Sequence, residues 1–158
     1  MTYHIEILPS ENADLDSVGQ LIFDSIHGLA HTHYSKEQLQ AWAPEPYAGD
    51  AAKMRFAGQI LFTASDDSGL AAIMSLTSNA HLDFAYTHPR CSGKGAASQT
   101  YSTLETYALA HDVQAITSDV SLVARPFFEK RGFKILAQNL PVKNGVGLTN
   151  FSARKDLI

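Results

Sequence analysis

The sequence predicts an α/β fold in which helices flank a mixed, mostly antiparallel central sheet. Three consecutive strand-like segments with short connections indicate an antiparallel meander. A later strand, long helix and strand indicate one parallel crossover in the same sheet. The chain has 158 residues, 45% of them hydrophobic, which fits one domain over residues 1–158 with a substantial core.

The chain begins with a predicted strand and two predicted helices. Residues 3–8 alternate between apolar and polar and stop at Pro9, which cannot donate to a ladder. Apolar residues recur at three- and four-residue steps over residues 15–29, which predicts a helix with one core-facing stripe. Ser35 and Gln38 have the spacing of a capping box, so a second helix begins there and ends before the prolines that follow.

The middle of the chain predicts a loop and then the meander. Residues 45–58 are rich in Pro, Gly and Ala, and we expect a loop with one short helical turn within residues 50–56. Residues 59–65 and 70–77 are strand-like, and the Asp-Asp-Ser-Gly sequence between them suits a hairpin turn. Residues 80–87 predict the third strand of the meander.

The last third predicts the crossover and two closing strands. A long helix follows Gly95 and ends near His111, and its expected buried side is Tyr101, Leu104, Tyr107, Ala108 and Ala110. Residues 115–120 predict a strand, and residues 122–131 predict a short helix that a glycine stops. The final strands are expected at residues 133–140 and 147–153, on either side of an Asn-Gly turn.

Charge and cysteine content exclude several classes of function. Twelve Lys and Arg against 16 Asp and Glu give a net charge of −4 without a dense basic run, so we expect neither nucleic-acid nor membrane binding. No apolar run is long enough to span a membrane, and the first residues do not resemble a signal peptide, so we expect a cytoplasmic protein. The single Cys91 has no Cys/His spacing around it. His27 and His31, with His33 nearby, are one helical turn apart and could suggest a metal, but no third ligand with metal spacing follows, so we expect none.

The segment with the clearest chemical pattern is residues 90–98, between a strand and a helix. Its two glycines and small residues allow backbone N–H groups to converge on an anion at the start of the helix. A tight turn with a helix cap is the structural alternative. The dinucleotide fingerprint would need Gly at Ser98, and the P-loop would need Gly at His88 and Ser or Thr at Gly95, so neither NAD nor ATP is favoured.

The same segment carries a family resemblance. Arg90-x-x-Gly93-x-Gly95 has the R/Q-x-x-G-x-G/A form that binds the pyrophosphate of coenzyme A in the GNAT family of acyltransferases, which this chain resembles. Residues 121–133 look like the family's N-x-x-A-x-x-x-Y-x-x-x-G-F segment. Residues 33–43 and 149–151 are similar to a small bacterial subgroup, so the resemblance spans nearly the whole chain.

The resemblance implies acetyl-coenzyme A as co-substrate and names the residues that bind it. Arg90 is expected to orient the loop or the phosphates, and Ser98 to add a hydroxyl contact. Tyr86 and Thr87 lie on a strand that is expected to splay from its neighbour and to pair with the pantetheine arm. The amides expected to hold the pyrophosphate belong to Ser92, Gly93, Lys94, Gly95, Ala96 and Ala97.

Two positions of the coenzyme A-binding segment depart from the family pattern. The frequent Asn is replaced by Ser121, which reaches less far. The frequent Tyr, which protonates the departing thiolate, is replaced by Phe128, which has no proton to give. Tyr34, a water or the ammonium of the acceptor could supply the proton instead, or the thiolate could leave unprotonated, since a thiol has a pKa of about 8.5.

An amine acceptor must lose a proton, which predicts a base near the cleft. By the two-residue period of a strand, residues 81, 83, 85 and 87 share one face, which makes Asp83 and His81 the candidate catalytic residues. A solvated strand face is the alternative interpretation. The resemblance places this region beside the acceptor pocket, so His33, Tyr34 and Trp42 are expected to form part of the pocket wall or to pack behind it.

These observations predict an acetyl-coenzyme A-dependent N-acetyltransferase. Acetyl would pass to a primary amine of a small molecule or peptide by direct attack in a ternary complex. A module that binds coenzyme A without turnover and a structural domain without ligand are the alternatives. The acceptor is open among polyamines, aminoglycosides, amino acids and protein amines, and a homodimer is the default expectation for the family.

Overall fold

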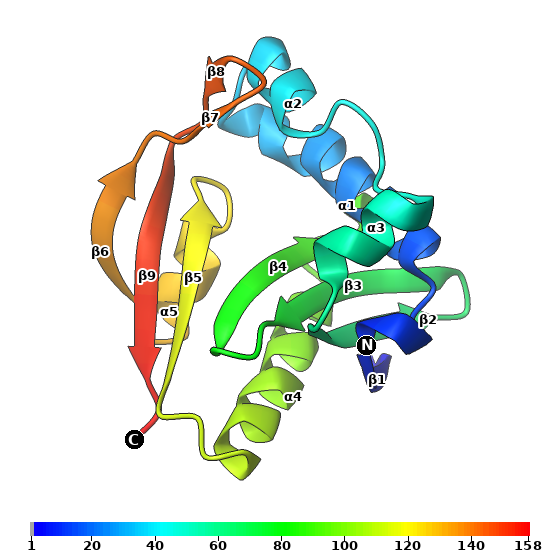
Figure 1. Ribbon diagram of the computed structural model, residues 1–158, viewed down its shortest axis with the longest axis vertical. Coiled ribbons are helices and arrows are strands. Elements are labelled where there is room, and N and C mark those ends of the chain that lie inside the picture. The colour runs from blue at the N-terminus through cyan, green and yellow to red at the C-terminus, as the bar shows by residue number, and fades with distance from the viewer. Residues whose placement is uncertain (1) are drawn as a thin grey trace.

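The computed structural model describes residues 2–158 and contains a central seven-stranded sheet (Figure 1). The strands are β1 (His4–Pro9), β2 (Ile60–Asp66), β3 (Gly69–Leu76), β4 (His81–Thr87), β5 (Ala115–Ser121), β6 (Lys134–Asn139), β7 (Val142–Lys143), β8 (Val146–Gly147) and β9 (Asn150–Asp156). The helices are α1 (Leu15–Leu29), α2 (Lys36–Trp42), α3 (Gly49–Phe56), α4 (Ala96–Ala110) and α5 (Arg125–Lys130). The sheet order is β1-β2-β3-β4-β5-β9-β6, and β7 and β8 form a separate pair.

The strand pairing confirms the predicted mixed, mostly antiparallel α/β fold. β1 to β4 form an antiparallel meander, and β9 pairs antiparallel with both β5 and β6. The parallel pair is β4 with β5, whose connection runs through α4 as the crossover pattern predicted. Within residues 2–158, none of the helices combines the length and the apolar character needed to cross a membrane.

β4 and β5 pair over only a short stretch. Their register consists of His81 with Thr117 and Leu82 with Ser118. Beyond these pairs the two strands diverge, as Figure 1 shows. From Asp83 onward, the edge of β4 that faces β5 therefore has no neighbouring strand.

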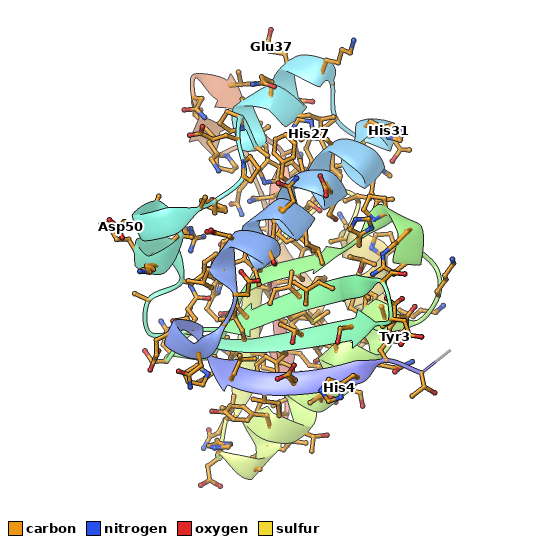
Figure 2. All side chains as sticks on the ribbon, turned by 90° about the vertical axis from the view of Figure 1, so that its right-hand side faces the viewer. Tyr3, His4, His27, His31, Glu37 and Asp50 are labelled. Atoms are coloured by element: carbon orange, nitrogen blue, oxygen red, sulfur yellow. The ribbon has the colours of Figure 1, made fainter. Side chains whose placement is uncertain are left out.

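The two largest apolar cores cover the two faces of the sheet. α1, α2 and α3 pack on one face, where buried Leu61, Ile73 and Phe84 contact them. α4 and α5 pack on the other face, against Phe62 and Met74 among others. Neighbouring residues of β2 thus belong to opposite cores, as the alternation of a strand requires. Figure 2 shows α1 lying across the strands of the first half of the sheet.

A β-bulge interrupts the alternation of β4. Ser75 pairs with Phe84 and Leu76 pairs with Leu82, so Asp83 is an extra residue without a partner on β3. As a result, Leu82 joins the core under α4, whereas Phe84 joins the core under α1. The expectation that residues 81, 83, 85 and 87 share one face is therefore wrong, because it counted through the bulge.

The region expected to be a loop with one helical turn contains α3, an eight-residue helix. Asp50 in its first turn and Arg55 in its last turn both complement the helix dipole. Ala52 and Phe56 are buried on its inner side. The N–H of Gly49 donates to Asp16 of α1 at 2.9 Å, which fixes the start of the helix.

Three smaller expectations also need correction. The helix expected over residues 122–131 is shorter, Arg125–Lys130, because Ser121 Oγ accepts the N–H of Ala124 in a turn before it. Ala110 is exposed, since it lies two residues after buried Ala108, on the other side of α4. The Asn-Gly turn connects β7 and β8, so it does not join β6 directly to β9.

Candidate active site

The loop between β4 and α4 presents backbone donors to one side. Gly93 and Gly95 have φ values of +72° and +87°, in the left-handed region that glycine adopts without strain. No hydrogen-bond partner for the N–H groups of Gly93, Gly95 and the first three residues of α4 is found within residues 2–158. These donors, at the positive end of a 15-residue helix, form a cradle that suits a phosphate group.

Arg90 braces this loop against the hairpin of β2 and β3. Its guanidinium donates to Asp66 at 2.7 Å and to the carbonyl oxygens of Gly69 and Leu70 at 3.1 and 3.0 Å. The hydrogen bond from Arg90 holds the pKa of the Asp66 carboxyl below its usual value. Of the two expected roles of Arg90, these contacts match loop orientation.

A cavity of about 390 Å³ extends from the cradle into the opening between β4 and β5. Ser92, Gly93 and Gly95 line it, whereas the side chain of Lys94 is exposed. Its other lining residues from the predicted set are Thr87, Tyr86, Ala96, Ala97, Ser98, Ser121, Phe128 and Trp42. We call it the loop cavity. The loop cavity has an anion cradle at one end and an open strand edge along its side. This arrangement fits an elongated ligand with phosphates at one end, such as coenzyme A.

A second cavity of about 220 Å³ lies beyond the opening, and we call it the central cavity. Asp83, Asp119 and Tyr34 line it. The side chains that also line the loop cavity are Trp42, Ala85, Tyr86, Ser121, Ala124 and Phe128. The two cavities therefore meet at the point where β4 and β5 separate, and two ligands could approach each other there.

Asp83 is tightly held at this junction. Arg55 Nη1 and Gln59 Nε2 donate to Asp83 Oδ2 at 2.5 and 2.8 Å, and Arg55 Nη2 donates to Oδ1 at 3.2 Å. Burial alone would raise the pKa of Asp83, but the hydrogen bonds from Arg55 and Gln59 outweigh it and leave this pKa below its usual value. Asp83 is therefore an ionised carboxylate, which is a weaker base than one with a raised pKa.

His81 lies beside the central cavity without lining it. Its Nδ1 is 2.8 Å from Thr117 Oγ1, and its Nε2 is 3.4 Å from a carboxylate oxygen of Asp119. Asp119 does line the cavity and is largely exposed. His81 thus contacts the site through Asp119, whereas Asp83 reaches it directly.

Tyr34 connects three parts of the chain through its hydroxyl group. The hydroxyl donates to the carbonyl oxygen of Thr149 at 2.5 Å and accepts the N–H of Leu122 at 2.9 Å. Burial raises the pKa of this hydroxyl. Its proton is already committed to a buried hydrogen bond, so Tyr34 is poorly suited to act as a general acid.

The residues expected in the acceptor wall separate into two groups. Trp42 packs edge-on against Tyr34, with ring centroids 5.2 Å apart, and lines the central cavity with it. His33 is exposed and its Nδ1 lies 2.9 Å from Thr32 Oγ1, away from the cavities that the other two line. His33 directly follows a short 3-10 turn, and it does not line either of these cavities.

His27 lies in the last turn of α1, and His31 lies in the 3-10 turn that follows. His27 Nε2 donates to the carbonyl oxygen of Ala43 at 2.7 Å, and Figure 2 shows His27 and His31 near the end of α1. In the part of the chain that the structure describes, no group of three metal-binding side chains comes together.

Several site residues carry no local sequence signal. Arg55 comes from the expected helical turn, Gln59 from the start of an expected strand, and Lys143 lines the central cavity from β7. Arg131 donates to the hydroxyl of Ser98 and stacks over Phe127, which brings a cation beside the first turn of α4. Asp119 alternates with Thr117 and Ser121 on one strand face, which is the one pattern that could have suggested it.

The splayed parallel pair and the cradle beside it are the features expected of the GNAT class of acyltransferases. The model of the acetyltransferase (GNAT) domain matches residues 30–155, and the chain belongs to this family. It is thus an acetyltransferase of the GNAT type.

Similar proteins agree with this assignment. The chain is 24% identical over 151 residues to "Uncharacterized N-acetyltransferase YafP" of Escherichia coli K12, covering 96% of this chain and 95% of that protein. A GCN5-related N-acetyltransferase structure from Rhodopseudomonas palustris superposes with a TM-score of 0.90 at 29% identity, covering 99% and 97% of the two chains. The fold also matches PaiA N-acetyltransferase from Thermoplasma acidophilum in complex with coenzyme A, with a TM-score of 0.73, 21% identity and 99% of both chains covered.

Proposed function

We propose that this protein transfers acetyl from acetyl-coenzyme A to a primary amine by direct attack in a ternary complex. The observation that carries the proposal is the junction between the loop cavity and the central cavity. A donor held in one cavity and an acceptor held in the other would meet at the splay of β4 and β5. No covalent enzyme intermediate is needed, because both substrates reach the same point.

The open edge of β4 supports the binding of the donor. Ala85, Tyr86 and Thr87 line the loop cavity, and they lie beyond the two residue pairs that join β4 to β5. An extended ligand can pair with their backbone groups as an added strand would. A backbone N–H near Thr87 is then available to polarise a carbonyl group in the cleft. Bound acetyl-coenzyme A supplies an activated acetyl group and a thiolate leaving group.

We assign Asp83 to the acceptor amine. Oδ1 of Asp83 accepts one hydrogen bond, at 3.2 Å, and has lone-pair capacity for another donor in the central cavity. The Arg55 contact keeps the Asp83 carboxylate ionised. This carboxylate therefore attracts the ammonium form of the acceptor, and it orients the amine after the ammonium has lost its proton. Positioning and electrostatic attraction suit this carboxylate better than strong base catalysis.

We propose that the leaving thiolate is protonated without a side-chain acid. Phe128 has no proton to give, and the hydroxyl of Tyr34 is committed to Thr149. The amine nitrogen forms a bond to the acetyl carbon, the carbon–sulfur bond breaks, and the proton released by the amine passes to sulfur directly or through water. A thiol pKa of about 8.5 makes an unprotonated thiolate an acceptable leaving group near neutral pH.

Two measurements test the proposal. Calorimetric titration should show selective binding of acetyl-coenzyme A over ATP and NAD. An assay of released thiol should then show that amines stimulate coenzyme A formation. Asp83→Asn should lower kcat/KM for the amine by about tenfold or more, since one oriented charge contact is lost.

The matched control is Asp67→Asn, which removes an exposed carboxylate in the β2–β3 turn. It should leave binding and turnover unchanged. Tight binding of acetyl-coenzyme A without any amine-stimulated release would refute the proposed transfer. Equal loss in both variants would refute the role of Asp83.

A further inference from the structure

A third cavity of about 410 Å³ opens beside the central cavity, and we call it the side cavity. It lies between α1 and the segment that connects α2 to α3. Its wall is mainly apolar and aromatic, and its larger side chains are Ile22, Phe23, Ile26, Trp42, Pro44, Pro46, Tyr47, Phe84 and Tyr86. A cavity of this size and composition suits the hydrophobic part of a small ligand.

The side cavity adjoins the reaction junction. Trp42 and Tyr86 line the loop, central and side cavities alike. Their rings lie 6.3 Å apart, so they form a common wall. A ligand with its hydrophobic part in the side cavity can therefore extend its reactive group into the central cavity, toward Asp83.

Lys143 lies at the boundary between the central cavity and the side cavity. It lines both the central and the side cavity, but it does not line the loop cavity, so it is not placed to hold the phosphates. The structure records no ion pair of Lys143 within residues 2–158. Its ammonium is thus available to a carboxylate of the ligand.

We infer that the acceptor is an α-amino acid with a large hydrophobic side chain. This inference rests on the proposed function. The amine would face Asp83 in the central cavity, the carboxylate would face Lys143, and the side chain would fill the side cavity. An α-amino acid carries its amine and carboxylate on one carbon, which matches two opposite charges at the boundary of an apolar cavity.

The same features argue against polycationic acceptors. Polyamines and aminoglycosides carry several ammonium groups, which call for several free carboxylates. The carboxylates lining the central and side cavities are Asp83, Asp119 and Glu45, and the ammonium of Lys143 lines both cavities, so its positive charge opposes a ligand with several ammonium groups. A peptide N-terminus lacks the adjacent carboxylate that Lys143 would bind.

A set of matched acceptors tests the inference. L-phenylalanine is compared with L-phenylalaninamide and phenethylamine, which lack the carboxylate, with glycine, which lacks the side chain, and with spermidine. Each amine is compared at the same concentration of its unprotonated form. We expect kcat/KM for L-phenylalanine to exceed each of the others by about tenfold or more, the factor that one good contact provides.

Two variants link the preference to the cavity walls. Lys143→Met should reduce the advantage of L-phenylalanine over L-phenylalaninamide to about threefold or less, because it removes the charge and keeps a similar length. Ala51→Phe, at an exposed position of α3 that lines the side cavity, should lower kcat/KM for L-phenylalanine more than for glycine. Lys134→Met on β6 is the control and should change neither ratio.

The outcomes separate this inference from the function on which it rests. If acetyl-coenzyme A binds but no amine releases coenzyme A, the proposed function itself fails. If amines are acetylated but phenethylamine, L-phenylalaninamide or spermidine surpasses L-phenylalanine, only the inferred acceptor class is overturned. An unchanged ratio in Lys143→Met also overturns it.

Discussion

Asp83 shows how one contact decides the chemistry of a residue. It lies 28 positions from Arg55 in sequence, yet two hydrogen bonds join their side chains. A local pattern cannot show such a pairing, so the sequence could suggest Asp83 as a base but could not reveal that its proton affinity is lowered. The glycines of the loop before α4 were predictable because their requirement is local: a left-handed φ and no side chain.

The Arg55–Asp83 pair should contribute to stability in a pH-dependent way. Because the pKa of Asp83 is lower in the folded state, its contribution is fully present above the unfolded pKa of about 3.9. It is lost as the pH falls through the folded value. Asp83→Asn should therefore lower the free energy of unfolding by about 1–2 kcal/mol at pH 7, less than for a fully buried pair because Arg55 is 40% exposed.

Urea denaturation of both proteins at pH 7 and in steps toward pH 3 checks this prediction. The difference in the free energy of unfolding between wild type and Asp83→Asn should shrink only below about pH 4. A constant difference across the whole range would contradict the assigned ion pair. Asp67→Asn again serves as the control, since its carboxylate is exposed.

Tyr34 offers a test that separates bracing from catalysis. Tyr34→Phe leaves the carbonyl oxygen of Thr149 and the N–H of Leu122 without their shared partner, which should cost about 1–3 kcal/mol of stability. If Tyr34 only braces the site, kcat should stay within about threefold of wild type, whereas loss of a general acid would lower it by about 10²-fold or more. Tyr107→Phe, which keeps the ring stacked on His111, is the control.

Among the elements, those with a strong local period were predicted closely. α1 combines a regular apolar stripe with an Asp14 cap, and α2 has the predicted capping box of Ser35 and Gln38. The bulge in β4 was missed because it is a property of the pairing with β3. α3 was underestimated because its helix is stabilised by buried Ala52 and Phe56, which are tertiary contacts.

The loop before α4 provides the prediction that belongs to an element. Gly93→Asp should weaken binding of acetyl-coenzyme A by about tenfold or more, because it adds a negative charge beside the phosphate cradle. A Cβ at Gly93 meets no atom within 4 Å, but the positive φ strains any side chain there, so the control must carry the same backbone strain. Calorimetric titration measures the loss.

Gly58→Asp is a closely matched control. Gly58 also has a positive φ, +77°, and a Cβ there likewise meets no atom within 4 Å. It lies before β2, outside the loop cavity. The affinity of the Gly58→Asp variant for acetyl-coenzyme A should therefore equal that of wild type. An equal loss of affinity in Gly58→Asp and Gly93→Asp would refute the assignment of the cradle.

The molecule as a whole is divided along the line where the ligand is expected. β1 to β4 form one half of the sheet and β5, β9 and β6 form the other, and two residue pairs join the halves as a ladder. The order of the elements predicted this crossover, but the periodicity of the sequence does not predict how far two parallel strands diverge. The resemblance to the family supplied that expectation, and the short register agrees with it.

A ligand that replaces the missing ladder should stabilise both halves together. At a concentration of 100 times its dissociation constant, a ligand adds about 2.7 kcal/mol to the free energy of unfolding. For a chain of this length, that corresponds to an increase in Tm of about 5–10 °C with acetyl-coenzyme A. ATP and NAD at the same concentration should produce no comparable increase, because neither can pair with the open edge of β4.

Hydrogen exchange determines whether this stabilisation has the expected origin. Amides of residues 83–87 on β4 should gain protection on binding, because the ligand takes the place that β5 leaves open. β2 pairs with a strand on each side, so the protection of its amides should change only as far as the global stability changes. An increase in Tm with protection confined to the loop after β4 would show that the phosphates alone are bound, and that β4 and β5 are not bridged.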